Sequence, residues 1–596
     1  MMRPIILIEK KHYLYSILVI ILFLILIGRF FYLQIYKRSF YFEASERNRI
    51  REIVIEPPRG VILDRKGEVL VDNRPSYSIY AIPFEVKKAD SVLKLAAQIM
   101  NMTPAEVKSI IRREASGYFY PVKLKRQIDF ETFVRIEEQK LDLPGIIYQS
   151  EPRRSYPAGV RAPHVFGYLG EINKDELTKP EYKGFRLGDV VGKKGLERVY
   201  EKELRGLRGY QYVEVDAFGR EIQRLKDKPE VPAFPGKNLH LTMDADLQRC
   251  IEARMDTLRG GAVVVDCKTG GVLALVSKPD YDPEIFTKPV PADLWRSMVN
   301  DPGKPLYDRM VQSLYPPGST YKIVLAAAAL ENGIIHPGWK NFCPGYLSFG
   351  KKTFDCWKQG GHGELDLIGA IEQSCNVYFY KLGLRTGLDT WATYSRQFLF
   401  GQPTDIDLID EKAGNVPDRA YFDRVFGKDR WPKGLVLNLA IGQGDLLVTP
   451  LQMARLAMIV ANEGVYYPFH LLDYLEDPAD GKRQYARIDS VYIKGISPAT
   501  YQIIKQGMYL VVHGPAGTAR AASYGDIKVA GKTGTAQNPH GEPHAWFIGF
   551  APFENPQIAF CILIENGGSG GRVAAPIARE IIKTYFYGAE KGHAQI

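Results

Sequence analysis

Three short motifs in this chain of 596 residues combine side chains that could form a serine nucleophile and its surroundings. In chain order they supply Ser319 with Lys322, Ser374 with Asn376, and Lys532 with Thr533, Gly534 and Thr535. A serine hydroxyl becomes nucleophilic when a neighbouring base takes its proton, and a lysine can be that base when its surroundings keep it neutral. The set therefore predicts a serine activated for nucleophilic attack.

Each motif alone is weak, because the chain contains a second S-x-x-K at Ser91 and Lys94 and a second K-T-G at 268–270. Ser91 opens an amphipathic helical pattern and is typical of a surface or capping position. Lys268 follows one strand-like run and precedes another, as expected of a hairpin turn. Context therefore favours the other copy of each motif.

Ser319 follows Tyr315-Pro316-Pro317-Gly318, which stops any preceding helix, and comes before the apolar run 323–330. This pattern predicts a buried helix with the serine at its N-terminus, where the helix dipole favours negative charge. Residues three apart share a helix face, so we expect Lys322 to reach the Ser319 hydroxyl.

Lys532 lies inside a predicted strand at 527–535. Gly534 in such a strand leaves room for the backbone of a ligand, and a substrate strand could pair alongside it.

Four residues with soft or nitrogen ligands follow one another between the first two motifs and across the second: Cys343, Cys356, His362 and Cys375. Three thiolates and one imidazole suit a structural tetrahedral Zn²⁺, although the gaps are longer than those of zinc fingers. Buried small hydrophobic residues or a disulfide between Cys343 and Cys356 remain alternatives. The other cysteines, Cys250, Cys267 and Cys561, are predicted to be core residues.

The net charge is +10 and the pI is near 9.0. Lysine and arginine are scattered along the chain without a nucleic-acid-binding motif, so an anionic membrane surface or anionic polymer is a simpler counterpart than nucleic acid.

Residues 13–35 are predominantly apolar and long enough, at about 1.5 Å per residue, to cross a bilayer. We predict an uncleaved transmembrane helix, since no small-residue cleavage site follows, whereas a cleaved signal peptide would need one. Positive charges flank both ends, so charge does not settle the orientation.

A Pro- and Gly-rich break at 226–236 divides the rest of the chain. Before it we expect short strands, including 51–56 and 61–64, and a helical insert at about 80–150. After it strands are predicted at 261–266, 272–277, 527–535, 545–550 and 558–564, with mainly helical sequence between the second and third and a final helix near 575–587. This is the pattern of an α+β fold, an antiparallel sheet covered by helices.

The three motifs, together with 57–65, 154–157 and 192–197, resemble a class B penicillin-binding protein over nearly the whole chain. Segment 354–363 is similar to the insertion of the elongation-type subgroup, penicillin-binding protein 2. The resemblance implies a cytoplasmic tail at 1–12, a transmembrane helix at 13–35, an elongated pedestal (dimerisation-type) domain at 36–235, a serine transpeptidase domain at 236–588 and a tail at 589–596.

The resemblance further implies a peptidoglycan D,D-transpeptidase that cross-links stem peptides ending in D-Ala-D-Ala during cell elongation. In that family Ser319 would be the nucleophile, Lys322 its base, Ser374 a proton relay and Asn376 a hydrogen-bond donor to the acyl amide. Lys532, Thr533 and Thr535 would bind the carboxylate region. β-Lactams would acylate Ser319.

Some members of the subgroup bind zinc beside the active site, with Asp in place of one cysteine, which makes Asp355 an alternative ligand to Cys356. Lacking a polymerase of its own, the protein is expected to pair with a RodA-like glycosyltransferase of the SEDS family and with elongation scaffold proteins. The resemblance places it in the bacterial cytoplasmic membrane, with the catalytic domain on the periplasmic or extracytoplasmic side.

Three other functions compete with this interpretation. A division-specific transpeptidase is the nearest, and the Cys/His insertion argues against it. A secreted β-lactamase would be a single shorter domain, and a β-lactam sensor would need further transmembrane helices or an intracellular effector domain.

Overall fold

The computed structural model of the protein describes residues 5–39, 50–86, 90–115, 121–185, 189–215, 221–225 and 229–588. The chain forms two compact units. Unit 1 contains residues 1–57, 76–151 and 207–234, and unit 2 contains residues 58–75, 152–206 and 235–596.

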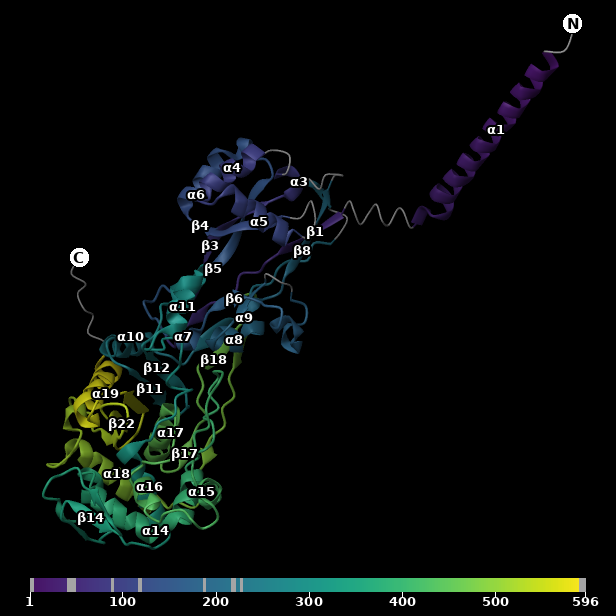
Figure 1. Ribbon diagram of the computed structural model, residues 1–596. Coiled ribbons are helices and arrows are strands. Elements are labelled where there is room, and N and C mark those ends of the chain that lie inside the picture. The colour runs from purple at the N-terminus through teal and green to yellow at the C-terminus, as the bar shows by residue number, and fades with distance from the viewer. Residues whose placement is uncertain are drawn as a thin grey trace. The chain divides into compact units, whose positions relative to one another are not determined.

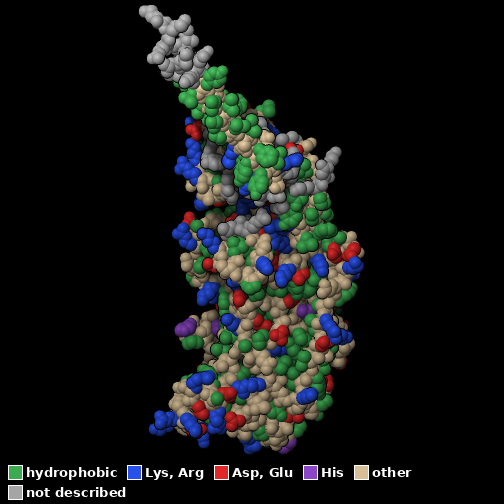
Figure 2. Space-filling view, turned by 90° about the vertical axis from the view of Figure 1, so that its right-hand side faces the viewer, with side chains coloured by type: hydrophobic (Ala, Val, Ile, Leu, Met, Phe, Trp, Pro, Cys, Tyr) green, Lys and Arg blue, Asp and Glu red, His purple; other side chains and the backbone are tan. Residues whose placement is uncertain are grey.

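Unit 1 begins with the apolar helix α1 (Ile5–Phe31), which continues as a π-helical turn over Tyr32–Tyr36. The stretch Tyr13–Tyr36 has a mean hydropathy of 2.6, and its long apolar side chains are exposed, as the green helix at the top of Figure 2 shows. Its length and composition suit a membrane span, because lipid can cover the side chains that the protein leaves exposed.

The remainder of unit 1 consists of a three-stranded sheet in the order β1-β8-β9 and an α/β part with its own core. In that part β3 pairs with β4 and β5, and helices α4, α5 and α6 supply apolar residues to the core. The elements are β1 (Ile50–Ile55), β3 (Val69–Ala81), α3 (Pro83–Val86), α4 (Asp90–Ile99), α5 (Pro104–Glu114), β4 (Val122–Ile128), α6 (Phe130–Glu138), β5 (Ile146–Ser155), β8 (Gly209–Val215) and β9 (Glu221–Arg224). The part of β3 before Ser76 and the part of β5 after Glu151 belong to unit 2.

Unit 2 is organised around a five-stranded antiparallel sheet in the order β12-β11-β23-β22-β21. The strands are β11 (Gly260–Asp266), β12 (Val272–Lys278), β21 (Ala530–Ala536), β22 (His544–Ala551) and β23 (Ile558–Ile564). Every residue of β23 is buried, so side chains on both faces of this strand are covered. Helices α10 (Ala245–Arg254) and α19 (Gly570–Tyr587) pack on the sheet and on each other, and so do α17 (Pro450–Ala461) and α18 (Pro498–His513) (Figure 1).

Two helices bring the motifs to the sheet. Helix α12 (Lys322–Glu331) is buried all round, as its run of alanine, isoleucine, valine and leucine requires. Helix α14 (Asn376–Gln397) packs against α12 and begins directly after Ser374 and its N-cap residue Cys375.

The remaining elements of unit 2 are shorter. They are β2 (Ile62–Leu63), α7 (Pro163–Phe166), β6 (Leu169–Glu171), β7 (Val190–Gly192), α8 (Gly195–Val199), α9 (Glu201–Arg205), β10 (Asn238–Leu241), α11 (Ala292–Asn300), β13 (Asn341–Cys343), β14 (Tyr346–Phe349), β15 (Lys352–Asp355), β16 (Gly363–Leu365), α13 (Leu367–Glu372), α15 (Arg419–Phe426), α16 (Leu435–Ala440), β17 (Val465–Tyr466), β18 (Leu472–Glu476), β19 (Arg483–Tyr485) and β20 (Val491–Tyr492).

The expected α+β class is confirmed, and the five predicted strands of the large sheet agree with the structure within three residues at each end. The interval between β12 and β21 is less helical than expected, since it also contains the short strands β13 to β20. The predicted break at 226–236 lies partly outside the described residues, as does the helical insert, and the tail at 589–596 lies wholly outside them.

The N-terminal segments of unit 2 are held by a buried group of charges. Arg59 donates to Glu197 and Glu201, and Arg154 donates to Glu197 and to the Gly60 carbonyl. Burial by itself would raise the pKa of Glu197, but Arg154 and Arg59 hold it below its ordinary value. The group thus joins the segments 58–75, 152–157 and 192–206, which are distant in sequence.

Glu197→Gln is expected to destabilise the protein by about 3 kcal/mol or more, because two buried guanidinium groups lose their shared carboxylate. Thermal unfolding of the full-length protein would detect this as a lower Tm. The stabilisation should be present above the ordinary pKa of glutamate and disappear as the pH falls through the lowered pKa of Glu197.

The matched control is Glu181→Gln, which removes a half-exposed partner of Arg198 and should cost less than about 1 kcal/mol. Equal effects of the two substitutions would contradict a special role for the buried group.

Candidate active site

Ser319 lies in a tight turn against the edge strand of the large sheet. The turn is a 3₁₀ helix over Gly318–Tyr321 that leads directly into α12. Gly318 has φ +57°, and its N–H donates to the Gly442 carbonyl at 2.8 Å. A side chain at Gly318 would come within 2.8 Å of the Thr535 carbonyl oxygen, so only glycine lets the turn approach β21 this closely.

Gly534 on β21 also lets the turn and the strand come close together. We expected this glycine to leave room for the backbone of a ligand, and the structure gives it a different role. A Cβ atom at Gly534 would lie 2.9 Å from the Pro317 carbonyl oxygen and 3.0 Å from Thr320 and Trp546. The space that glycine leaves open is therefore filled by the serine-bearing turn itself, and not by a ligand backbone.

Lys322 is fully buried, and its ammonium group points to the second motif. Its Nζ donates to the Ser374 carbonyl oxygen at 2.8 Å and to Asn376 Oδ1 at 2.8 Å, and lies 3.4 Å from Ser374 Oγ. Within the described residues none of its hydrogen bonds goes to Ser319, contrary to our expectation. The ammonium group bonds instead to the Ser374 carbonyl and the Asn376 amide oxygen, which are stronger acceptors than a hydroxyl group. A contact between a catalytic base and its nucleophile often forms fully only when the substrate binds.

Ser374 connects the two lysines. Its backbone has φ +53°, an uncommon conformation for a residue other than glycine. Lys532 Nζ donates to Ser374 Oγ at 2.9 Å and to the Thr533 carbonyl oxygen at 3.1 Å. The structure thus brings Lys322, Ser374 and Lys532 to one hydroxyl group, although they come from three distant segments.

Burial changes the basicity of both lysines. It lowers the pKa of Lys322 to about 8, although the thiols of Cys375 and Cys356 oppose the change. Burial, reinforced by the charge of Lys322, holds the pKa of Lys532 well below its ordinary value. Near neutral pH a minority of Lys322 is therefore a neutral amine, and this form is a base.

The other predicted residues line the same strand and loop. Thr535 is exposed on β21, whereas Thr533 is buried and shares a hydrogen bond of 2.8 Å with Thr518. Asn376 Nδ2 donates to the Asp355 carbonyl oxygen.

Two residues at the site escaped the sequence analysis. Gln443 donates to the Thr535 carbonyl oxygen at 3.2 Å, and Thr518 contacts Thr533 as described above. Both stand in glycine-containing turns, in Gly442-Gln443-Gly444 and close after Gly514, which was the available signal.

The Cys/His group forms a cluster next to this site. The ligand atoms of Cys343, Cys356, His362 and Cys375 all lie within 4.8 Å of one another. His362 Nδ1 is 3.4 Å from Cys356 Sγ and 3.7 Å from Cys343 Sγ. A tetrahedron with Zn–S of about 2.3 Å and Zn–N of about 2.0 Å has edges of roughly 3.5–3.8 Å, so this donor set fits zinc.

The positions of these residues bear on the disulfide and on the choice between Asp355 and Cys356. All six cysteines are free, so the structure contains no Cys343–Cys356 disulfide. Asp355 is outside the cluster and Cys356 is inside it. Cys267 and Cys561 are buried as expected, but Cys250 is only partly buried and accepts a hydrogen bond from Thr584, so it is not a core residue.

The second copies of the motifs have the structural roles that their context predicted. Ser91 is exposed on α4 in unit 1. Lys268 and Thr269 lie in the turn between β11 and β12, where their N–H groups donate to Asp266.

The sheet with its covering helices and the three converging motifs define an enzyme of the serine transpeptidase kind. Two family descriptions match the chain: "Penicillin binding protein transpeptidase domain" over residues 260–583 and "Penicillin-binding Protein dimerisation domain" over residues 54–241. The peptidoglycan D,D-transpeptidase MrdA of Salmonella typhimurium is 35% identical over 611 aligned positions, which cover 97% of each chain.

Solved structures agree with this family. The penicillin-binding protein PBP2 of Helicobacter pylori, in a complex with MreC, has a TM-score of 0.79 and 29% identity, and the match covers 90% of this chain and 99% of that one. A chain from a peptidoglycan synthase complex has a TM-score of 0.72 and 28% identity over 98% of this chain and 100% of its own. The protein belongs to the class B penicillin-binding proteins of the PBP2 type, the peptidoglycan D,D-transpeptidases.

Proposed function

We propose that the protein cross-links peptidoglycan stem peptides during cell elongation, with Ser319 as its nucleophile. The observation that carries the proposal is the convergence of two buried lysines on the Ser374 hydroxyl, beside the turn that presents Ser319. Acyl transfer needs a base, a proton path to the leaving group and an anion-binding site in one place, and this arrangement supplies all three.

In the proposed reaction Ser319 Oγ attacks the carbonyl of the penultimate D-Ala, and neutral Lys322 takes the hydroxyl proton. The C–N bond breaks, Ser374 passes a proton to the departing D-Ala nitrogen, and an ester joins the peptide to Ser319. An amine from another stem peptide then attacks the ester and releases the serine. The backbone N–H groups of Ser319 and Thr535 would stabilise the oxyanion.

The rest of the site would hold the substrate. Lys532, Thr533 and Thr535 would bind its terminal carboxylate, and Asn376 would donate to the acyl amide. β-Lactams would acylate Ser319 because they resemble the D-Ala-D-Ala backbone.

Penicillin should form a covalent adduct on Ser319 that lasts for hours, because within the described residues no carboxylate hydrogen-bonds to Lys322 or Ser374 that could activate a water against the ester. Mass spectrometry of the full-length protein would detect the added mass and locate it by peptide mapping. Ser319→Ala should abolish the adduct, and Ser91→Ala, the control in the second S-x-x-K, should retain it. Rapid turnover would indicate a β-lactamase, and an adduct that survives Ser319→Ala would place the nucleophile elsewhere.

We further propose that the Cys/His cluster binds one structural Zn²⁺, held by Cys343, Cys356, His362 and Cys375. Bound zinc would cross-link the segments around β13, β15 and β16 to the start of α14 and would supply no chemistry to the acyl transfer. Cys375 directly follows Ser374, so the cluster would help to hold that serine in its left-handed conformation.

Purified full-length protein should contain about one zinc ion per chain, which inductively coupled plasma mass spectrometry would measure. Cys343→Ser should remove most of this zinc and lower the Tm. Cys250→Ser changes a cysteine outside the cluster and should retain the metal. Equal zinc contents in the two variants would rule out this site.

We also propose that helix α1 anchors the protein in the bacterial cytoplasmic membrane, with the catalytic domain outside the cytoplasm. Residues 36–235 would form the pedestal and residues 236–588 the transpeptidase domain. The PBP2 of H. pylori has been solved with MreC, and another similar chain comes from a synthase complex. By this similarity the partners would be an elongation scaffold protein and a RodA-like glycosyltransferase that polymerises the glycan strand.

Affinity purification of the cross-linked full-length chain should recover both elongation partners. Replacing residues 13–35 with an unrelated membrane helix should reduce recovery of the glycosyltransferase, because that partner is embedded in the membrane. Repeated recovery of division proteins alone would contradict the elongation role.

A further inference from the structure

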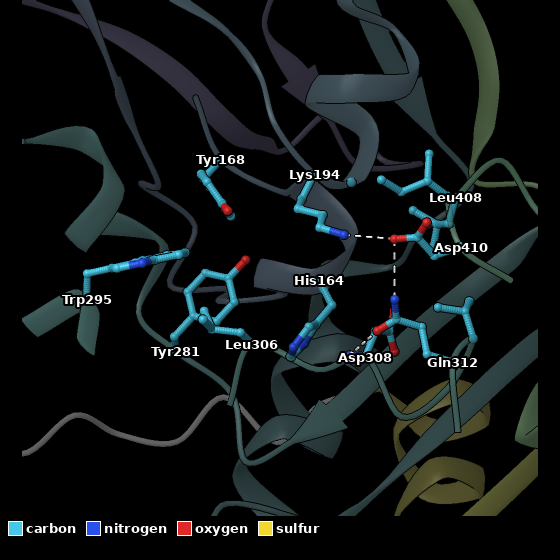
Figure 3. A pocket seen from close by; sticks show the side chains of 13 residues that line it. His164, Tyr168, Lys194, Tyr281, Trp295, Leu306, Asp308, Gln312, Leu408 and Asp410 are labelled. Carbon is cyan, nitrogen blue, oxygen red and sulfur yellow. Dashed lines mark hydrogen bonds and ion pairs between the residues drawn. The ribbon is translucent and has the colours of Figure 1, made fainter. Parts of the chain in front are cut away.

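Unit 2 contains a cavity that the proposed chemistry does not use. It has a volume of about 160 Å³ and lies between the segment that carries α7 and α8, helix α11 and the loop around residue 410 (Figure 3). Its walls include Tyr168, Tyr281 and Trp295 on one side and Lys194, Asp410 and Gln312 on the other. We call these six residues and the space between them the aromatic pocket.

The aromatic wall is fixed in place by its neighbours. Tyr168 stacks on Phe286 with ring centroids 4.0 Å apart, and Phe286 meets Tyr281 and Trp295 edge to face. The Tyr281 hydroxyl donates to the Pro163 carbonyl oxygen at 3.0 Å. Such a linked set of rings loses little entropy when a ligand binds, because its orientations are already set.

The opposite wall offers hydrogen bonds without a net charge. Lys194 Nζ is 2.8 Å from Asp410 Oδ2, and Gln312 Nε2 is 3.4 Å from the same oxygen. The Lys194–Asp410 pair is half-exposed, so its members can exchange this contact for a ligand at small cost.

The floor of the pocket adds no strong charge either. Burial lowers the pKa of His164 and raises the pKa of Asp308, so each group is shifted towards its neutral form. A phosphate or a free carboxylate would find a single cation already paired with Asp410. The ligand that fits is neutral, has a flat apolar face and carries donors and acceptors at its edge.

A pyranose ring with an acetamido group has these properties. Its C–H face stacks on aromatic rings, and its hydroxyl and amide groups bond to side chains such as Lys194, Asp410 and Gln312. A volume of about 160 Å³ corresponds to roughly five water molecules, which leaves room for part of one sugar unit, such as its acetamido group and one face of its ring.

We propose that the aromatic pocket binds an N-acetylated sugar of the peptidoglycan glycan strand. The inference rests on the proposed function, which supplies a polymer made of such sugars. Figure 1 shows α7, α8 and α11 away from α14, and none of the residues that line the pocket belongs to the three motifs. The pocket would therefore hold the strand at a point separate from the stem peptide that reacts.

The test uses a tetramer of N-acetylglucosamine, which has the sugar chemistry and no stem peptide. Saturation-transfer NMR and titration with the full-length protein, in a detergent without a sugar head group, would measure its binding. Trp295→Ala and Tyr168→Ala should each weaken binding by about tenfold or more. Leu294→Ala is the matched control, since Leu294 neighbours Trp295 on α11, is equally exposed and does not line the pocket. Its affinity should equal that of the unchanged protein.

Three results would overturn the inference: no binding of the tetramer, equal binding by the Trp295→Ala and Leu294→Ala variants, or equal binding of a glucose tetramer that lacks acetamido groups. Penicillin acylation, measured on the same protein preparation, reports on Ser319 and not on the pocket. Loss of acylation with retained sugar binding would count against the proposed function alone, and the reverse pattern would count against the pocket alone. Thermal unfolding of each variant identifies one that fails to fold, and Lys194→Met then replaces it, with weaker binding expected and unchanged affinity counting against the pocket.

Discussion

The burial of two lysine side chains around one serine hydroxyl is the constraint on which the rest of the catalytic unit depends. Among the described residues no carboxylate pairs with Lys322 or Lys532, so their charged forms lose hydration without a counter-ion. Packing elsewhere in the fold must offset this loss of hydration free energy. It does so through α12, whose residues are buried all round, and through a sheet strand that is covered on both faces.

The lack of a carboxylate beside the two buried lysines also makes their protonation sensitive to substrate binding. A carboxylate placed beside Lys532 would restore the missing counter-charge and raise the pKa of this lysine, so substrate binding and protonation favour each other. Lys322, whose acceptors are an amide oxygen and a carbonyl oxygen, would feel this change through Ser374 Oγ. One hydroxyl group therefore links the proposed base, Lys322, to Lys532, the lysine proposed to bind the substrate carboxylate.

Much of this architecture could be predicted, because local sequence patterns indicate the strands and helices. Apolar runs located the strands β11, β12, β22 and β23, the stretch around the K-T-G motif located β21, and the sequence before Ser319 located the start of α12. The contacts that make the site were less accessible. They depend on which distant segments meet, and the spacing of residues along the chain does not predict this. Examples are the approach of Gly318 to Thr535, the left-handed conformation of Ser374 and the hydrogen bonds of Lys322.

The composition of unit 2 is a second result of non-local packing. Residues 58–75 and 152–206 precede the Pro- and Gly-rich break, yet Leu70, Val71, Leu196 and Leu204 belong to the same core as the large sheet. A boundary drawn at a Pro- and Gly-rich stretch follows the order of the chain, whereas a core gathers segments from both sides of that stretch. The hairpin β14–β15 and the other short strands were missed because so few residues carry too little periodicity.

The strand β2 and the charged group around Glu197 also have a consequence for how the protein is made. Residues 58–75 are synthesised long before β10, the parallel neighbour of β2. These early segments have apolar side chains whose partners in the core are synthesised much later, so the core of unit 2 cannot be completed until those partners are present. Biogenesis, and not only catalysis, then sets a limit on sequence change in the segments that precede the transpeptidase domain, because they must stay soluble while they wait.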